Sequence, residues 1–431
     1  MDDLIYRLIS LLGFGVLCGF AWITGTRVRV EKKTIIGAGL LAWGMGGLVF
    51  MSPGSRMAIQ FFNDVFVAFL SASGKGAVFL FGPLSLGPGG KLADGTASIG
   101  FILAFQVLPS VIFFSGLVSL LYYFGIIQVV VRFFARIFYR AMKLSGAESL
   151  AASTNIFVGI ESGLAIRKYI PKMTQSELLT LLTCMMATVA STVMAVYVLA
   201  LNKVFPGVAG HLVSASIISI PCAVLMSKLA CPETGEPLTR EIESVIDGSD
   251  ESNDSKTASG AMTVLIDGGA QGIQMAMGIA ALLIVVLGIK GGLDLVLGYV
   301  NLPGGGVLSL DKILGWIAWP FAVLLGLRHE EWQAGAQLLG TRFIETEVSA
   351  YFQLAAMQSG DQPVFSPRSL SAMTYALCGF VHIASLSIFV GGLSRLTPER
   401  TGELGLIGLK ALWIAFLATL STGCIAGVLD S

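Results

Sequence analysis

Carboxylates in strongly apolar surroundings are the first residues in this sequence that could do chemistry. Glu161 lies between two glycines in the segment 155–171, and Glu345 and Glu347 lie in the segment 340–352. A carboxylate in the hydrocarbon region of a membrane costs several kcal/mol unless it faces water, a cation or a ligand that donates hydrogen bonds. Glu161 and Glu347 are therefore candidate binding groups, carried by broken apolar segments in opposite halves of the chain.

A structural interpretation is also open for each of these residues. Glu161 and Glu347 could be interfacial residues at hairpin ends, or could form ion pairs with Arg167 or Arg342. Glu345 could face solvent at the mouth of a hairpin. No nucleophile–base pair, HExxH sequence or glycine-rich phosphate loop accompanies them in the sequence, so the spacing gives no support for an enzyme.

The composition is that of a membrane protein. Of the 431 residues, 55% are hydrophobic and 13% are charged, and the mean hydropathy is +0.80, whereas a soluble domain carries about 25% charged residues. The 52 glycines suit close packing of helices in lipid. Lys plus Arg equals Asp plus Glu at 27 each, so nothing indicates nucleic-acid binding. The six cysteines show no metal-ligand spacing and are predicted to be small core residues.

Apolar runs long enough to cross a bilayer predict eight spans. The first run has no A-x-A-like cleavage site, so it predicts a retained helix rather than a signal peptide. The stretch 52–96, rich in glycine and proline in places, predicts a loop with short helices at the membrane surface, and 232–260 predicts an acidic aqueous loop. The expected spans are 4–23, 34–51, 99–126, 176–201, 211–229, 273–296, 370–393 and 404–428.

A helix lying in the membrane interface is predicted at 128–143. Arg132, Arg136 and Arg140 fall on one helical face, with aromatic and aliphatic residues around the rest. Placing every basic loop in the cytoplasm requires that each broken segment enter and leave on the same side, as a re-entrant hairpin. Both termini then lie outside the cytoplasm. The basic loops are 27–33, 132–143, 167–172 and 395–400.

The two halves of the chain predict an inverted repeat. Each has a re-entrant hairpin (145–171 and 308–357), then a span interrupted by polar residues, then a plain span, which gives alternating access around a midplane site. The sequence thus predicts an all-α integral membrane protein with about eight transmembrane helices, two re-entrant hairpins and an interfacial amphipathic helix. The expected divisions are 1–143 (scaffold-type and interfacial helices), 144–229 (first hairpin and two spans), 230–300 (acidic cytoplasmic loop and scaffold span) and 301–431 (second hairpin and two spans).

Five motifs follow one another along the chain: NIFVG from Asn155, IPKMTQSEL from Ile170, GTR followed after four residues by Glu347, YALCGF from Tyr375 and TPER-x-GELGLIGLKAL from Thr397. Together they resemble those of the concentrative nucleoside transporters. The resemblance runs from residue 101 to near the end of the sequence. It implies a homotrimer in the cytoplasmic membrane, in which each protomer has a fixed scaffold and a mobile transport domain. It also implies uptake of a nucleoside-like substrate driven by a sodium or proton gradient.

The resemblance implies a substrate site, but only some of the family's substrate-binding residues are present in this sequence. The family Gln that contacts the nucleobase is Ile160 here, and Glu161 aligns with the family Glu only if one residue is deleted. Glu347 matches the Glu that grips the ribose hydroxyls. The Asn beside it is replaced by Thr346, and the ribose-contacting Asn of the next span is replaced by His382. The implied substrate-binding residues are Ile160, Glu161, Val193, Thr346, Glu347, Phe380, His382 and Ser385.

The resemblance also implies a sodium site, and its residues are better preserved. The family uses main-chain oxygens at the first hairpin tip, with a hydroxyl and a carbonyl from the next span. Here these ligands are Asn155, Val158, Thr188 and Val189, and a hard cation prefers such oxygen ligands. The structural alternative is a buried Thr188 that bonds back to its own helix. Sodium or a proton is the implied coupling ion, with no other cofactor.

His382 has two interpretations. A lone histidine in an apolar span is more often a core residue with satisfied hydrogen bonds, but the resemblance places this one against ribose. An imidazole donates and accepts hydrogen bonds as an amide can, and it also titrates near neutrality. We therefore hypothesise a proton-sensitive substrate site.

The sequence as a whole predicts cation-coupled uptake of nucleosides or related ribosyl compounds by an elevator-type, alternating-access mechanism. One alternative is a transporter of a different polar solute, because the nucleobase-binding residues are altered. The other is a receptor or structural protein that reuses the fold without transport.

Overall fold

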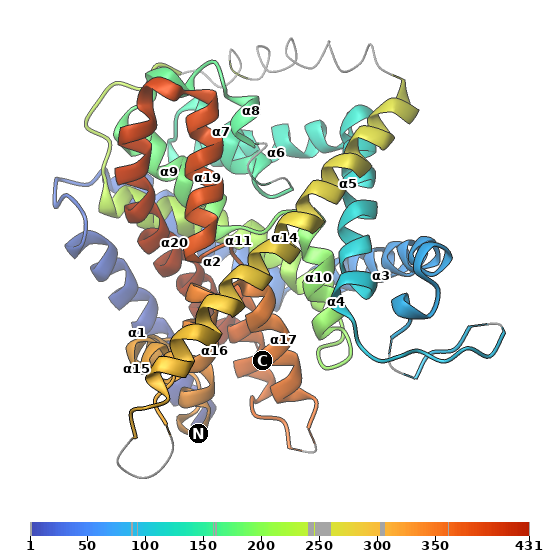
Figure 1. The fold of residues 1–431 in the computed structure, drawn as a ribbon. Helices are drawn as coiled ribbons and strands as arrows, with labels where there is room; N and C mark the ends of the chain where they lie inside the picture. The colour runs from blue at the N-terminus through green and yellow to red at the C-terminus, as the bar shows by residue number, and fades with distance from the viewer. Residues whose placement is uncertain are drawn as a thin grey trace.

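Helices form nearly all of the regular structure (Figure 1). The computed structural model describes residues 2–87, 89–92, 94–157, 159, 162–239, 245, 260–301, 307–360 and 362–430. Within these residues the non-helical pairing is limited to two isolated antiparallel bridges, Lys91–Ala97 and Asn301–Val307. Eight helical segments of this part of the chain are long and apolar enough to cross a membrane. The prediction of an all-α membrane protein is confirmed.

The helix bounds are as follows. The first part of the chain contains α1 (Asp2–Ile23), α2 (Lys32–Met51), α3 (Pro53–Phe81), α4 (Leu103–Gln106), α5 (Leu108–Tyr123), α6 (Ile126–Met142), α7 (Gly146–Thr154), α8 (Ser162–Ala165), α9 (Gln175–Ala187), α10 (Ser191–Leu201) and α11 (Val208–Ala230). The second part contains α14 (Ala261–Leu297), α15 (Leu310–Leu324), α16 (Trp332–Ile344), α17 (Glu347–Gln358), α18 (Pro367–Leu377), α19 (Ile383–Leu396) and α20 (Thr401–Leu429). Short 3-10 turns are η1 (Gly82–Ser85), η2 (Ile170–Lys172), η3 (His329–Glu331) and η4 (Pro398–Arg400).

The segment after the second span differs from the prediction. We expected a loop with short helices over 52–96, but α3 is a continuous helix of 29 residues. Its apolar composition qualifies it as a candidate span, and in Figure 1 it runs across the direction of α5. The glycines and prolines of 82–95 suggested the loop, and the described residues of that part are irregular after η1. Pro53 does not interrupt α3, because it occupies the first helical turn, where its missing N–H has no helical partner to lose.

The predicted span 370–393 is not continuous. It is divided into α18 and α19 by an irregular stretch, Cys378–His382. Gly379 explains the close packing of this stretch, because a Cβ there would lie 2.7 Å from Thr419 Cγ2 and 3.0 Å from Met186 O. The predicted span 176–201 is divided in the same way, between α9 and α10. Both breaks lie at polar or small residues, where the chain can leave the helical hydrogen-bond pattern.

The interfacial helix is found where the arginine spacing predicted it. Helix α6 buries one face of Ile127, Val131, Ala135, Phe138 and Met142. Arg136 and Arg140 are exposed on the opposite side. In Figure 1 the helix runs across the direction of α5, as expected for a helix that lies along a membrane surface.

The inverted repeat is visible in the helix order. In the first unit α7 and α8 form a hairpin, α9 and α10 form a broken span, and α11 follows. In the second unit α16 and α17 form the hairpin, α18 and α19 the broken span, and α20 follows. Figure 1 places α7 and α8 near one end of the molecule and α16 and α17 near the other. Helix α15 is a separate element that precedes the second hairpin. The hairpin therefore covers fewer residues than the predicted range 308–357.

The centre of the molecule consists of the spans that follow the hairpins. The α9–α10, α11 and α20 spans are 83% buried over their most apolar windows, against 22% for α1 and 17% for α14. Helices α9, α11 and α20 pack on one another. The outer helices are left with wide apolar surfaces, as lipid-facing helices require. The two breaks therefore lie within protein, where irregular backbone is tolerated at membrane depth.

Candidate functional site

Glu347 is the centre of a polar cluster at the second hairpin tip. It is the first residue of α17, and its side chain is 3% exposed. The Tyr197 hydroxyl donates a hydrogen bond of 2.8 Å to Oε1. Nε2 of His382 lies 3.0 Å from Oε2, but no donor among the described residues makes an aligned hydrogen bond to that oxygen. One carboxylate oxygen is thus satisfied, and the other remains available to a further donor.

The hydrogen bonds of His382 fix its orientation. The residue caps the start of α19, and its Nδ1 accepts a hydrogen bond of 3.1 Å from the backbone N–H of Ser385. A neutral imidazole that accepts at Nδ1 carries its proton on Nε2, the atom that faces Glu347. The Ser385 hydroxyl donates back to the His382 carbonyl over 2.6 Å. The break after α18 therefore presents an N–H group toward the carboxylate of the second hairpin, which precedes it in the chain.

Other predicted substrate residues lie on the same elements. Thr346 caps α17 by accepting a hydrogen bond of 3.2 Å from the Ser349 N–H, and it is buried. Val193 is buried on α10, one turn before Tyr197 and therefore on the same helical face. Phe380 is half-buried in the second break, with its ring 5.9 Å from that of Phe389.

The structure adds Tyr197, which the sequence analysis missed. It is fully buried on α10 in the run TVMAVYVLAL. A tyrosine among aliphatic residues has the pattern of an ordinary core residue. The only available signal was its hydroxyl, because a buried tyrosine hydroxyl usually has a hydrogen-bond partner. That partner, Glu347, lies in the other half of the chain.

The first hairpin tip has uncharged polar groups in its described part. Asn155 ends α7, and its Oδ1 accepts a hydrogen bond of 2.7 Å from the Ser162 hydroxyl. Its Nδ2 is buried, and no acceptor among the described residues bonds to it. The carbonyl of Phe157 accepts a hydrogen bond of 3.1 Å from the N–H of Ser191, so this tip abuts the break between α9 and α10.

The predicted cation ligands of the next span lie in that break. Thr188 and Val189 are buried directly after the end of α9. The Thr188 hydroxyl donates a hydrogen bond of 2.9 Å to the Cys184 carbonyl, so the back-bonding alternative is present. A hydroxyl that donates one hydrogen bond still has lone pairs for a cation. Val158, Ile160 and Glu161 lie outside the described residues.

The oxygens of the first tip suit a hard cation. The ends of α7, at Asn155, and of α9 leave main-chain carbonyls without helical partners, and the Thr188 hydroxyl adds a neutral side-chain oxygen. Na⁺ and similar ions prefer oxygen ligands and need no titratable side chain. The described donor set therefore fits a monovalent cation.

The ion-pair alternatives for the glutamates can be judged from their neighbours. Arg342 is fully buried but donates to the Ala376 carbonyl and, over 3.1 Å, to Thr419 Oγ1. Its guanidinium also lies over the Phe416 ring. Glu345 is buried rather than solvent-facing, and its Oε1 lies 2.6 Å from Lys290 Nζ. Of Glu345 and Glu347, only Glu345 pairs with a lysine or arginine among the described residues.

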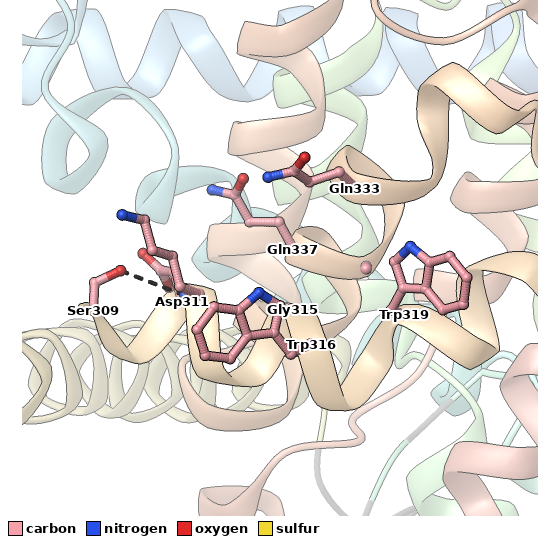
Figure 2. Close-up of a pocket in the computed structure, with 9 residues that line it drawn as sticks. Ser309, Asp311, Gly315, Trp316, Trp319, Gln333 and Gln337 are labelled. Carbon is pink, nitrogen blue, oxygen red and sulfur yellow. Dashed lines mark hydrogen bonds between the residues drawn. The ribbon is translucent and has the colours of Figure 1, made fainter. Parts of the chain in front are cut away.

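A separate cavity lies on the face between α15 and α16 (Figure 2). Its volume is about 470 Å³, and its lining includes two indoles, Trp316 and Trp319, and two amides, Gln333 and Gln337. Both indoles are largely exposed, as tryptophans at a membrane–water interface often are. The residues around Glu347 do not line it, so the cavity and the polar cluster are different places.

Comparison with family models decides the family. Residues 211–427 match the model for the C-terminus of the Na⁺ dependent nucleoside transporters. The chain belongs to the Na⁺-dependent nucleoside transporter family. Residues 12–84 match the N-terminal model of this family, and residues 104–204 match a gate model described as nucleoside recognition. The family resemblance in the sequence motifs is confirmed.

Relatives align along nearly the whole chain. An uncharacterised transporter of Haemophilus influenzae is 33% identical over 98% of this chain and 97% of its own length. The nucleoside permease NupC of Helicobacter pylori is 29% identical over 98% and 97%. The rat sodium/nucleoside cotransporter 1 is 32% identical, and the match spans 98% of this chain and 64% of the rat protein.

Solved structures match the fold in more than one conformation. CNTnw in an inward-facing, substrate-bound state superposes with a TM-score of 0.86 at 28% identity, covering 98% of both chains. A variant of CNTnw in an outward-facing state gives the same TM-score over 98% and 97%. The multi-pass membrane fold with two re-entrant hairpins in an inverted repeat is confirmed. The roles of individual site residues stay predictions.

Proposed function

We propose that this protein takes up nucleosides or related ribosyl compounds by alternating access, driven by a cation gradient. The observation that carries the proposal is the environment of Glu347. Its Oε1 is bonded to Tyr197, whereas Oε2 is buried 3.0 Å from Nε2 of His382 and has no well-aligned hydrogen bond from a described residue. A buried acceptor in this condition is costly unless a ligand reaches it. The vicinal hydroxyls of a ribose are donors of the required kind.

The surroundings of Glu347 support the same substrate class. His382 and Thr346 add polar groups beside the carboxylate, and Val193 and Phe380 add apolar surface for a base or sugar face. Ser385 holds the His382 imidazole in place. At the first tip Ile160 has no polar side chain, and Glu161 is the remaining polar candidate. We therefore include modified nucleosides and other ribosyl compounds among the proposed substrates.

We assign the coupling ion to the first tip. Asn155, Val158, Thr188 and Val189 are the proposed sodium ligands, supported by the uncharged oxygens of Asn155 and Thr188 beside a helix break. A proton is the second candidate, because the imidazole of His382 lies 3.0 Å from a carboxylate.

The assembly and the motion are part of the proposal. An elevator-type movement of the two hairpins and their broken spans would carry the substrate past the outer helices of a homotrimer in the cytoplasmic membrane. The match to CNTnw in both inward- and outward-facing states supports a moving domain. A receptor that binds a nucleoside without moving it is the competing function.

The decisive experiment is uptake in proteoliposomes containing the full chain. Labelled uridine and adenosine are offered under an inward sodium gradient, an inward proton gradient, or neither. We expect accumulation above the external concentration under the sodium gradient, abolished by a sodium ionophore. Equilibration that ignores both gradients would refute coupling, and binding without uptake would support the receptor. A 2′,3′-dideoxynucleoside is expected to compete poorly, because it lacks the hydroxyls that Glu347 would accept.

A further inference from the structure

Lys290 is a largely buried cation outside the proposed substrate and sodium sites. Its Nζ lies 2.6 Å from Oε1 of Glu345, beside the second hairpin tip, and 2.7 Å from Oδ2 of Asp311 at the start of α15. The Lys290 side chain is 14% exposed and that of Glu345 is 2% exposed. The ammonium group of Lys290 therefore pairs with two carboxylates that belong to separate elements.

Helix α14, which carries Lys290, spans a long distance between two parts of the molecule. Its 37 residues extend about 55 Å, and Figure 1 shows it crossing the molecule diagonally. Near its beginning it packs on α5, where a Cβ at Gly272 would lie 2.6 Å from Ile112 Cα. In the last third of the helix, Lys290 forms ion pairs with the two carboxylates. One turn later, Asp294 accepts a hydrogen bond of 2.7 Å from the N–H of Leu310.

The elements held by Lys290 form one packed unit. Helices α15 and α16 lie side by side, and a Cβ at Gly340 would lie 2.7 Å from Leu314 Cβ. Asp311 at the start of α15 and Glu345 after the end of α16 thus lie at the same end of this unit. Because Asp311 and Glu345 belong to one unit, a movement of that unit away from α14 separates Lys290 from both carboxylates.

Glu345 is also connected directly to the substrate cluster. Its N–H closes the last turn of α16 by donating to the Thr341 carbonyl over 2.8 Å. Thr346 and Glu347 follow at once. A shift of Glu345 therefore shifts the Glu347 carboxylate relative to His382, which is held on a different element.

We propose that Lys290 is a positioning residue of the transport cycle. It holds the second hairpin tip against α14 in this conformation, and its bond to Glu345 opens whenever the hairpin moves to exchange substrate. The inference rests on the proposed transport function and adds a residue, and an ionic contact, that set the position of the hairpin.

Cross-linking tests whether the pair has to separate. Lys290→Cys and Glu345→Cys are combined, bridged with a short bifunctional thiol reagent, and assayed for nucleoside uptake before and after reduction. We expect the bridge to form, uptake to fall at least tenfold, and reduction to restore it. The matched control bridges Asp311→Cys with Glu345→Cys inside the α15–α16 unit, where the bridge should leave uptake at the level of the same variant before bridging. Single-cysteine variants control for modification of the native thiols.

The outcomes separate this inference from the proposed function. If the unmodified protein fails to accumulate nucleosides, the transport function is wrong and the inference falls with it. If it transports but the Lys290–Glu345 bridge leaves uptake intact, or does not form, only the inference is overturned.

A charge-neutral variant gives a second test without leaving a buried charge unpaired. Lys290→Met, Glu345→Leu and Asp311→Asn are combined in one protein. We expect the KM for nucleoside to rise at least threefold, while the sodium dependence and the thermal unfolding midpoint in detergent remain as in the unaltered protein. An unchanged KM in a folded protein would show that Lys290 does not position the tip.

Discussion

The two hairpin tips share one arrangement of helices but present different side chains. Each tip abuts the break of the span that follows its own hairpin. The described polar groups of the first tip are neutral, namely the Asn155 amide, the Thr188 hydroxyl and main-chain carbonyls. The second tip brings together the carboxylate of Glu347, the imidazole of His382 and, from α10, the phenol of Tyr197.

The repeated arrangement of helices places each tip beside a helix break, and the side chains at the tip determine what can bind there. A break in a buried helix frees main-chain groups in both units. Neutral oxygens alone suit a cation that carries its own charge. A buried carboxylate with one free oxygen suits a solute that donates hydrogen bonds. On these grounds we assign the ion to the first tip and the hydroxyl-binding carboxylate to the second, while Ile160 and Glu161 of the first tip stay proposed substrate contacts.

Helix α10 connects the two tips. It begins at Ser191, whose N–H bonds to the Phe157 carbonyl of the first tip, and it carries Tyr197, which bonds to Glu347 of the second. A change in the geometry of the first break can therefore reach the substrate carboxylate through one short rigid helix. The comparison can be tested by altering each tip separately.

The largest effect is expected from Glu347→Gln. The change removes the charge and places an amide N–H₂ where Tyr197 and His382 both present donors, so nucleoside uptake (kcat/KM) should fall about 100-fold or more. Initial rates in proteoliposomes measure it. Glu403→Gln is the matched control, because Glu403 pairs with Arg400 at the surface, 2.7 Å apart. If Glu347→Gln retained normal uptake, the assignment of the substrate to the second tip would be wrong.

Asn155→Ala should act on the ion rather than on the substrate. Loss of the side-chain amide removes the hydrogen bond from Ser162 that orders the first tip, and with it the support for the Asn155 main-chain oxygen. The sodium concentration for half-maximal uptake is expected to rise about tenfold, as loss of a ligand's support does at other metal sites. The nucleoside KM at saturating sodium should change little. Ser153→Ala is the control, since that hydroxyl bonds only to the Leu150 carbonyl of its own helix among described partners. An equal rise in nucleoside KM would contradict the division between tips.

His382→Asn tests the titratable character of the second tip. A second proton on the imidazole would go to Nδ1, which now accepts from the Ser385 N–H, and the resulting cation would engage Glu347 more tightly. We expect uptake by the unaltered protein to fall about threefold as the pH is lowered. The variant should lose that dependence. His329→Asn, at an exposed residue, is the control. Identical pH profiles for His382→Asn and the unaltered protein would refute the hypothesis.

The spans were largely predictable, but the breaks within them were not. Hydropathy is a local property, so the apolar runs predicted most long helices. The break after α18 depends on Gly379 packing against Thr419 and Met186, which are distant in sequence. The prediction for 52–96 missed helix α3 because the glycines and prolines of 82–95, which favour a loop, begin only after the helix ends at Phe81.

Some residues of the candidate site could likewise be predicted from the sequence, and others could not. Glu347 could be found from the sequence because a carboxylate is rare in an apolar segment, and His382 because a family motif surrounds it. Tyr197 and the Lys290–Glu345 pair could not, because each depends on a partner far away in the sequence. Burial of Glu345 corrects the idea that it could face solvent.

The smallest effect is expected at Thr188, where two interpretations of one hydroxyl can be separated. The hydroxyl bonds to the Cys184 carbonyl, so Thr188→Val removes that hydrogen bond and any contact with a cation together. Thr188→Ser keeps both. If the hydroxyl is a sodium ligand, Thr188→Val should raise the half-maximal sodium concentration about threefold, with Thr188→Ser unchanged. If it only bonds to its helix, both variants should match the unaltered protein, because main-chain oxygens at the break would then bind the ion without it.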